Sequence, residues 1–209
     1  MIKYSRSDIE GMDRITRLTL INSITGYKPA NLIGTINSIG NTNLAIISSV
    51  VHLGSDPALI AFIMRPLIGE RHTMENILET GYYTINHIHR DIAEKAHFTS
   101  ADFPREVSEF DRCKLTPVFL DDFKAPFVAD SKIKLGMSFA ETIEIKRNGT
   151  IMVIGQVEKI CMDEPYFTPS AGLDLAQAGT ICISGLDSYH EVEKWATFPY
   201  ARVNEVPEF

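Results

Sequence analysis

The sequence predicts a mainly β fold, an antiparallel barrel or sandwich with a few short peripheral helices. Segments rich in Ile, Val, Leu and Thr recur along the chain, as they do in strands. Tight connections made of Gly, Asn, Asp and Pro separate these segments. Helical periodicity is confined to short runs. The balance of at least seven strands against few helices indicates this fold class.

A long hairpin in the second half of the chain carries the most regular pattern. Residues 135–145 alternate apolar and polar side chains, which predicts a half-buried strand. Asn148-Gly149 follows, and this dipeptide favours the two positive φ angles of a type I′ turn. Residues 150–161 are therefore expected to return antiparallel to the first strand.

Five shorter strands are predicted from the same kind of composition. Gly40-Asn41 and the turn-forming residues 54–57 separate the first three of them. The five segments are residues 31–39, 44–51, 58–64, 82–88 and 180–185.

Three short helices are also predicted, at residues 73–80, 91–98 and 171–178. Thr73 is expected to cap the first helix, which ends at Gly81. Asp91 begins the second helix in a near capping box, and Gly179 ends the third.

One domain over residues 1–209 is expected from this length, because domains usually hold about 100–200 residues. An irregular insertion lies around residues 102–130, where three prolines interrupt any regular pattern. A tail begins at about residue 187. No internal repeat or linker divides the chain.

The composition excludes several classes of protein. Hydrophobic residues at 44% and charged residues at 22% exclude a disordered chain. A net charge of −7 argues against a broad nucleic-acid surface. No apolar run approaches the roughly 18 residues of a membrane-spanning helix. We therefore expect a cytoplasmic protein with no nucleic-acid or membrane partner.

The common phosphate-loop, Rossmann and hydrolase motifs are absent from the sequence. His87 and His89 would lie on one face of a strand, with His97 able to lie nearby, so a metal site is conceivable. Satisfied or exposed histidines are the favoured alternative, because no carboxylate or cysteine completes a ligand set. We expect no metal site.

An anion-binding site is one interpretation of the segment before the first predicted helix. Arg71, His72 and Thr73 place a guanidinium, an imidazole and a hydroxyl beside the free N–H groups of a helix N-terminus. A capped helix with a solvated arginine is the alternative, and taken alone the segment favours it, because such caps are common.

Two adjacent hydroxyls also need an explanation. Ser48 and Ser49 end an apolar strand, and a buried hydroxyl without a hydrogen bond costs about 1–3 kcal/mol. Either backbone carbonyls satisfy them or a ligand does. Asn43, just upstream, carries an amide able to hold the edge of a heterocycle or to stabilise a turn.

Taken in order, these and other segments resemble the flavin reductase-like family of FMN-binding split β-barrels. The resemblance extends over roughly residues 28–190. The segments that carry it are residues 28–35, 43–50, 55–60, 64–66, 71–77, 83–86 and 96–101.

The resemblance implies an antiparallel split β-barrel with Greek-key character. It also implies a homodimer that holds one FMN per subunit near the dimer interface. The residues that it implies for cofactor binding fall into four groups. Asn43, Ser48, Ser49 and Val50 would meet the flavin ring and ribityl chain, Arg71, His72 and Thr73 the phosphate, Asn86 a strand along the flavin, and His97, Thr99 and Ser100 the cofactor or substrate side.

The same resemblance implies an FMN-dependent oxidoreductase, in which NADH or NADPH reduces the bound flavin and the flavin passes the electrons to an acceptor. No catalytic side chain is required, because the flavin carries the chemistry. Arg65 would stabilise reduced flavin or form an ion pair with Glu70 or Glu75. The alternatives are an FMN-binding protein without turnover, acting as a carrier or redox sensor, and a scaffold without flavin.

Overall fold

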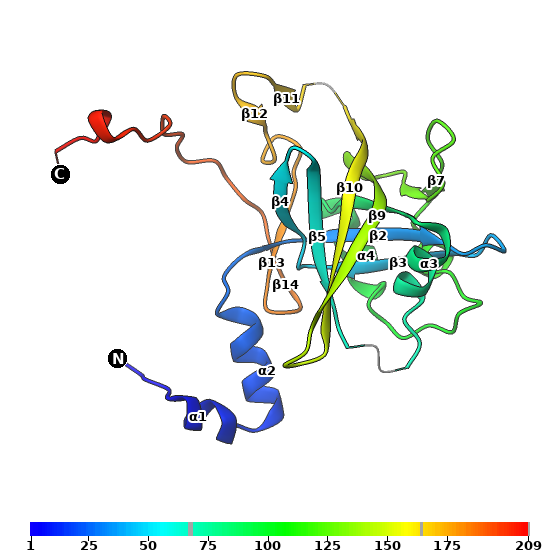
Figure 1. Cartoon of the computed structure of the whole chain (residues 1–209), viewed down its shortest axis with the longest axis horizontal. Helices are drawn as coiled ribbons and strands as arrows, with labels where there is room; N and C mark the ends of the chain where they lie inside the picture. The colour runs from blue at the N-terminus through cyan, green and yellow to red at the C-terminus, as the bar shows by residue number, and fades with distance from the viewer. Residues whose placement is uncertain (67–68, 164, 209) are drawn as a thin grey trace.

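A seven-stranded antiparallel sheet dominates the computed structural model, which describes residues 1–66, 69–163 and 165–208 (Figure 1). The order of its strands is β3-β2-β6-β9-β10-β5-β4. Their bounds are β2 Asn31–Ile36, β3 Thr42–Ile47, β4 Val51–Ser55, β5 Ala58–Met64, β6 Tyr82–His87, β9 Ile133–Ile145 and β10 Thr150–Met162. The expected mainly β architecture with few helices is confirmed, and each predicted sheet segment overlaps an observed strand.

The long hairpin forms as predicted, but its turn differs from the prediction. Thr150 pairs with Ile145, so four residues rather than two connect the strands. The N–H groups of Asn148 and Gly149 both donate to the carbonyl of Ile145, at 3.1 and 2.9 Å. Gly149 alone has a positive φ, of 72°. The prediction of a type I′ turn was therefore wrong, because the longer loop needs only one left-handed residue.

The two edges of the sheet are drawn towards each other by a short connection. β3 and β4 lie at opposite edges, yet only residues 48–50 separate them in sequence. Seven strands laid flat would hold their edges about 28 Å apart, whereas four extended backbone steps span at most about 14 Å. The sheet must therefore curl. No ladder joins β3 to β4 within the residues that the structure describes.

Apolar side chains inside the curled sheet form one of two cores. Phe62, Tyr83 and Val153 are fully buried there, and Met74 and Ile77 enter from helix α3 (His72–Thr80). The helix thus covers one end of the sheet.

The second core lies between the sheet and the segments that cover it. Leu32 and Leu44 from the sheet pack there with Phe110, Val128 and Ile183. These segments include α4 (Ala93–Phe98), α5 (Glu109–Arg112) and three short strand pairings. The short strands are β1 Lys28–Pro29, β7 Pro117–Val118, β8 Phe127–Val128, β13 Cys182–Ser184 and β14 Ser188–His190.

Two of the three predicted helices form, each with a start that differs from the prediction. α3 ends at Gly81 as expected, with φ at 75°, but the residue before its first turn is Arg71 rather than Thr73, and no side chain caps it. α4 is preceded by a short 3-10 helix, Arg90–Ile92, and Asp91 makes no cap.

The predicted helix at 171–178 was wrong. The strand β12 (Gly172–Leu173) pairs with β11 (Phe167–Thr168), and turns follow as far as Gly179. Gly172 has a φ of 76°, which a helix interior does not accommodate.

Two helices absent from the predictions precede the sheet. They are α1 (Arg6–Gly11) and α2 (Arg14–Ser23), which lie to one side of the large sheet in Figure 1. Ser5 caps α1 through a full capping box, and Asp13 accepts from the N–H groups of Ile15 and Thr16. No helix in the described ranges has the length and apolar character needed to cross a membrane.

Candidate functional site

The connection between the two sheet edges leaves its backbone unpaired. Neither Ser48, Ser49 nor Val50 makes a backbone hydrogen bond to another backbone group in the described part of the chain. All three are half-buried. Free N–H and C=O groups held beside apolar strands can form hydrogen bonds with the acceptors and donors along the edge of a planar heterocycle.

The two serine hydroxyls have different partners. Ser49 Oγ donates to the carbonyl of Ile63 at 3.1 Å and accepts from the N–H of Ile63 at 3.0 Å. It therefore fixes the connection to β5. Ser48 Oγ forms no hydrogen bond to any described residue. Of the two interpretations left open by the sequence, the backbone one holds for Ser49, and Ser48 is available to a ligand.

The second part of the site is the N-terminus of α3. Asn43 Nδ2, on β3, donates to Thr73 Oγ1 at 2.9 Å, and both side chains are buried. The threonine hydroxyl accepts this bond, so its own proton remains free to donate. Strand and helix thus orient one hydroxyl donor next to the first-turn N–H groups.

Arg71, two residues before Thr73 in the sequence, carries an unused donor. Its backbone N–H donates to Glu75 Oε1 at 3.0 Å, and Glu75 also pairs with Arg105. The Arg71 Nε atom is buried and has no hydrogen-bond partner among the described residues. A buried donor left unpaired costs about 1–3 kcal/mol, so its presence points to an anion that completes the site.

His72 is surrounded by acidic groups. Its Nε2 atom lies 3.0 Å from Glu70 Oε2, and the buried carboxylate of Glu109 interacts with it electrostatically. Glu109 Oε2 accepts from the N–H of Leu44 at 2.9 Å, which pairs the open edge of β3. Burial raises the pKa of Glu109, although the Leu44 bond opposes this. Sequence patterns missed Glu109, because it lies in the irregular insertion.

β3 joins the two parts of the site. Asn43 and Ser48 are five residues apart, so about 17 Å of strand separates the anion-binding helix end from the unpaired connection. An elongated ligand with an anionic group at one end and a hydrogen-bonding ring at the other matches this arrangement. The residues present fit a flavin mononucleotide, on the grounds of the orphaned Arg71 Nε, the free Thr73 proton and the unpaired backbone.

Asn86 does not lie with these residues. It is fully buried, its Nδ2 donates to the carbonyl of Leu32 and to Thr84 Oγ1, and its Oδ1 accepts from the N–H of Val128. Because all of these groups are protein atoms, Asn86 serves to attach the insertion to the sheet.

The three residues predicted on the following helix form another group. His97 Nδ1 lies 3.0 Å from the hydroxyl of Tyr189, while Thr99 Oγ1 and Ser100 Oγ donate to carbonyls of their own helix. α4 packs against β3. This group lies next to the strand of the site, and no hydrogen bond joins it to Asn43, Ser48 or Ser49 in the described chain. Burial raises the pKa of Tyr189 to about 12.

Arg65 is exposed just after β5, whose Ile63 holds Ser49. The two carboxylates proposed as its ion-pair partners are engaged elsewhere, Glu70 with His72 and Glu75 with Arg105. Its guanidinium is therefore not fixed by either of them.

The fold and site define a β protein that has a buried, unpaired arginine donor at the start of α3 and an unpaired connection at the other end of β3. The family model for the flavin reductase like domain matches residues 27–171. The chain belongs to this flavin-binding family.

Solved structures agree with this assignment. A putative flavin reductase with split barrel domain from Shewanella frigidimarina is 44% identical, with a TM-score of 0.92, and the match covers 96% of this chain and all of that one. Nitrilotriacetate monooxygenase component B from Bacillus cereus is 18% identical, with a TM-score of 0.83 and coverage of 95% and 98%. Flavoredoxin of Desulfovibrio vulgaris is 20% identical, with a TM-score of 0.72 and coverage of 84% and 92%.

Proposed function

We propose that the protein is an FMN-dependent oxidoreductase of the flavin reductase type, which passes reducing equivalents from NADH or NADPH through bound FMN to an acceptor. Its family and its likeness to a putative flavin reductase support a flavin-related oxidoreductase. The observation that carries the proposal is the unsatisfied Arg71 Nε at the start of α3, a helix that Asn43 and Thr73 tie to the end of β3 opposite the unpaired residues 48–50.

Arg71, His72 and Thr73 would hold the phosphate. Arg71 contributes a charge-assisted bond, Thr73 its free proton, and the first turn of α3 its N–H groups. Ser48 and the backbone of Ser49 and Val50 would hold the ring edge. Bound flavin supplies the electron-transfer chemistry, so the side chains are required to bind, orient and tune it.

Three carboxylates around the helix end favour FMN over FAD. Glu70 contacts His72, Glu75 accepts from the N–H of Arg71, and the Glu109 charge also reaches His72. One phosphate finds donors there, whereas a second phosphate would meet these like charges at close range. The site therefore suits a mononucleotide.

The remaining parts of the proposal concern architecture and assembly. We propose that the curled sheet is a Greek-key split β-barrel whose split lies at residues 48–50. We also propose a homodimer with FMN near its interface, and His97, Thr99, Ser100 and Arg65 on the side where the nicotinamide or acceptor approaches.

The absorbance spectrum of the protein purified without added cofactor tests the proposal, followed by release and identification of the chromophore. A two-band flavin spectrum with FMN released is expected, together with NADH or NADPH oxidation well above the rate of free FMN. Bound FMN without that acceleration would indicate a carrier or redox sensor instead. A colourless protein that fails to bind added FMN would refute the cofactor assignment.

A further inference from the structure

Residues 1–27, here the helical arm, carry apolar side chains that the rest of the chain does not cover. α2 has no buried residue. Ile15 is 76% exposed, and Leu18, Ile21, Ile24 and Tyr27 are exposed too. Helices in globular proteins normally bury an apolar face, so this arm lacks the surface against which it would pack.

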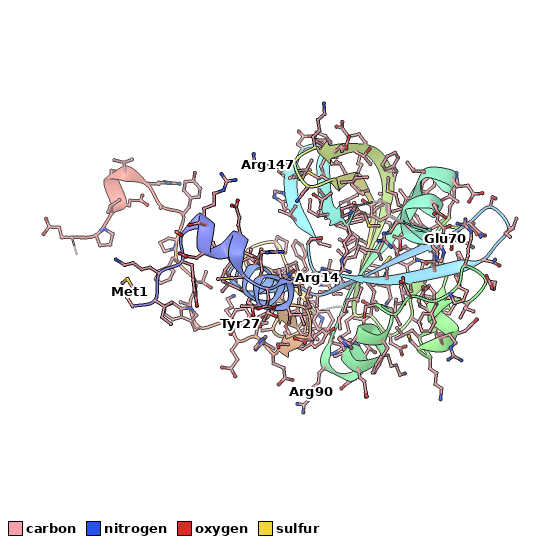
Figure 2. The ribbon with its side chains drawn as sticks, turned by 90° about the horizontal axis from the view of Figure 1, so that it is seen from below. Met1, Arg14, Tyr27, Glu70, Arg90 and Arg147 are labelled. Carbon is pink, nitrogen blue, oxygen red and sulfur yellow. The ribbon has the colours of Figure 1, made fainter. Side chains whose placement is uncertain are left out.

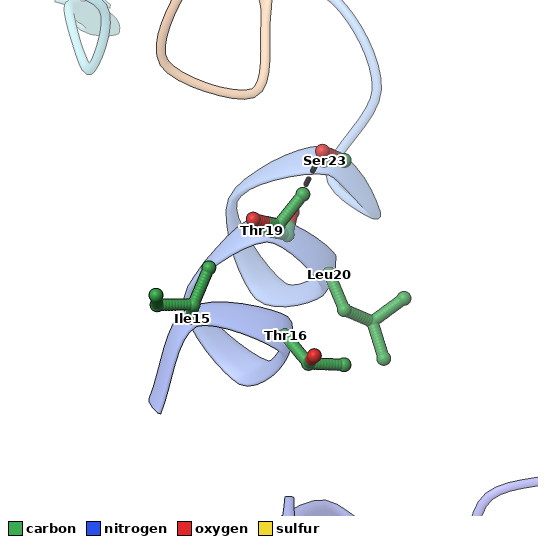
Figure 3. A pocket seen from close by; sticks show the side chains of 5 residues that line it. All are labelled: Ile15, Thr16, Thr19, Leu20 and Ser23. Carbon is green, nitrogen blue, oxygen red and sulfur yellow. Dashed lines mark hydrogen bonds between the residues drawn. The ribbon is translucent and has the colours of Figure 1, made fainter. Parts of the chain in front are cut away.

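A hollow of about 420 Å³ runs along one side of α2 (Figure 3). Hydroxyl and apolar side chains line it together. The lining residues are Ile15, Thr16, Thr19, Leu20 and Ser23. All of them belong to α2, so the opposite wall of the hollow is missing.

Residues 191–208, here the extended tail, are exposed throughout. Trp195 is 88% exposed, and Phe198 and Tyr200 are similarly open to solvent. The helical arm and the extended tail leave the sheet on the same side of the molecule (Figures 1 and 2). Three exposed aromatic side chains in one short segment are typical of an interface.

The total surface is too large for a separate molecule of this size. A compact monomer of 23.4 kDa exposes about 9,700 Å². This chain exposes 13490 Å², an excess of about 3,800 Å². Obligate homodimers bury about 2,000–5,000 Å² in total. The excess is therefore larger than the area that one chain contributes to such an interface.

The arm and the tail also have a defined position. They make up about a fifth of the chain, so a TM-score of 0.92 to the Shewanella frigidimarina protein requires most of their residues to superpose. Segments with so little packing against their own domain hold one position in two proteins only if something else fixes them. A second copy of its own chain is a partner that each of the two proteins can supply.

We propose that the extended tail of each chain packs along α2 of a second copy, with Trp195 and Phe198 placed over the hollow. Two-fold symmetry repeats the contact, because each copy supplies one arm and one tail. The charges on the two segments are complementary at one pair of positions. Arg14 on α2 and Glu193 in the tail have no ion-pair partner within the described residues. The inference extends the homodimer proposed above and needs no flavin chemistry.

Sedimentation of the full-length protein, with its flavin, tests the contact. We expect a mass twice that of the chain, and a rise of at least 100-fold in the dimer Kd for Leu20→Glu and for Trp195→Ser. Leu20 is half-buried and Trp195 is exposed, and α2 buries no residue, so we expect both variants to fold. Ile39→Glu, an 81% exposed isoleucine in another turn, is the matched control and should leave Kd unchanged.

Two results would overturn the inference. Arm and tail variants that dimerise like the wild type would place the interface elsewhere and leave the homodimer itself intact. A monomeric wild type would refute both. FMN content per chain is measured in every sample, so that a loss of flavin is not mistaken for a loss of the contact.

Trp195 provides an independent measurement, because it is the single tryptophan of the chain. Its emission maximum should lie at short wavelength where the dimer predominates and shift to longer wavelength on dilution below Kd. Emission typical of exposed tryptophan in samples that sediment as dimers would show that the tail does not take part.

Discussion

The Thr73 hydroxyl illustrates how one hydrogen bond can prepare a ligand site. Asn43 has no acceptor role in this pair, because its Nδ2 atom donates at 2.9 Å. The threonine proton is therefore directed away from Asn43. We propose that this proton and the unpaired Nε of Arg71 serve the same anion.

Removal of these donors is expected to weaken FMN binding. Charge-assisted hydrogen bonds contribute about 1.5–3 kcal/mol, so Arg71→Ala should raise the Kd for FMN by about 10- to 150-fold. Thr73→Val should raise it further, and the double variant should lose several kcal/mol. Quenching of FMN fluorescence gives these values. Arg90→Ala, which removes only an exposed ion pair with Glu191, is the control. Unchanged affinity in the double variant would exclude this phosphate site.

His87 makes stability depend on pH. Burial lowers the pKa of His87 from 6.5 to about 4. Between these values the unfolded chain binds a proton that the folded chain does not, so stability falls as the pH decreases. The loss between pH 7 and pH 4.5 should be about 2–3 kcal/mol. Urea unfolding at both pH values measures it, and His87→Gln should reduce the difference. An equal loss in the variant would assign the effect to other groups.

At the scale of elements, sequence patterns identified the sheet, because alternation and turn residues act locally. The end of α3 was also predictable, since Gly81 takes a left-handed conformation there. Two kinds of feature were missed. α1 and α2 were missed, although α2 carries the apolar side chains Ile15, Leu18 and Ile21 at a spacing of three residues. The segment at 171–178 had helical composition, yet Gly172 directs it into a hairpin.

The candidate site was predictable only in part. Asn43, Arg71 and Thr73 carry ligand-type groups close in sequence to a strand or a helix start. The interior role of Asn86 and the edge pairing by Glu109 depend on the insertion, whose position over the sheet has no local pattern. Ser48 and Ser49 are adjacent, and only the position of β5 decides which of them is already bonded.

Glu109 replaces a strand at the edge of β3, and its variants test this role. Glu109→Ala would leave the N–H of Leu44 buried and unpaired, at a cost of about 1–3 kcal/mol. Glu109→Gln keeps an acceptor and removes the charge. Because burial raises the pKa of Glu109, the folded chain holds that proton more tightly, so wild-type stability decreases as pH rises through this range. Denaturant unfolding at pH 8 should therefore find the Gln variant at least as stable as the wild type. If the Gln variant is as unstable as the Ala variant, the role of Glu109 as an acceptor at the edge of β3 is contradicted.

At the scale of the whole molecule, the exposed arm and tail couple folding to association. If dimerisation covers part of the excess surface, mass action stabilises the folded chain as concentration increases. The apparent Tm should rise by several degrees over a 100-fold increase in protein concentration. Leu20→Glu should melt at one temperature throughout. Differential scanning calorimetry distinguishes the two, and a constant wild-type Tm would contradict the coupling.

The unpaired backbone at residues 48–50 has a consequence for the protein without its cofactor. Exposed strand edges recruit other chains by adding strands, and proteins avoid this by covering them. Glu109 pairs part of β3, but the backbone groups of the connection beyond it have no backbone hydrogen-bond partner within the described residues. A bound flavin would occupy those groups and so protect the chain from aggregation. Light scattering during mild heating should show flavin-free protein aggregating well before the loaded form.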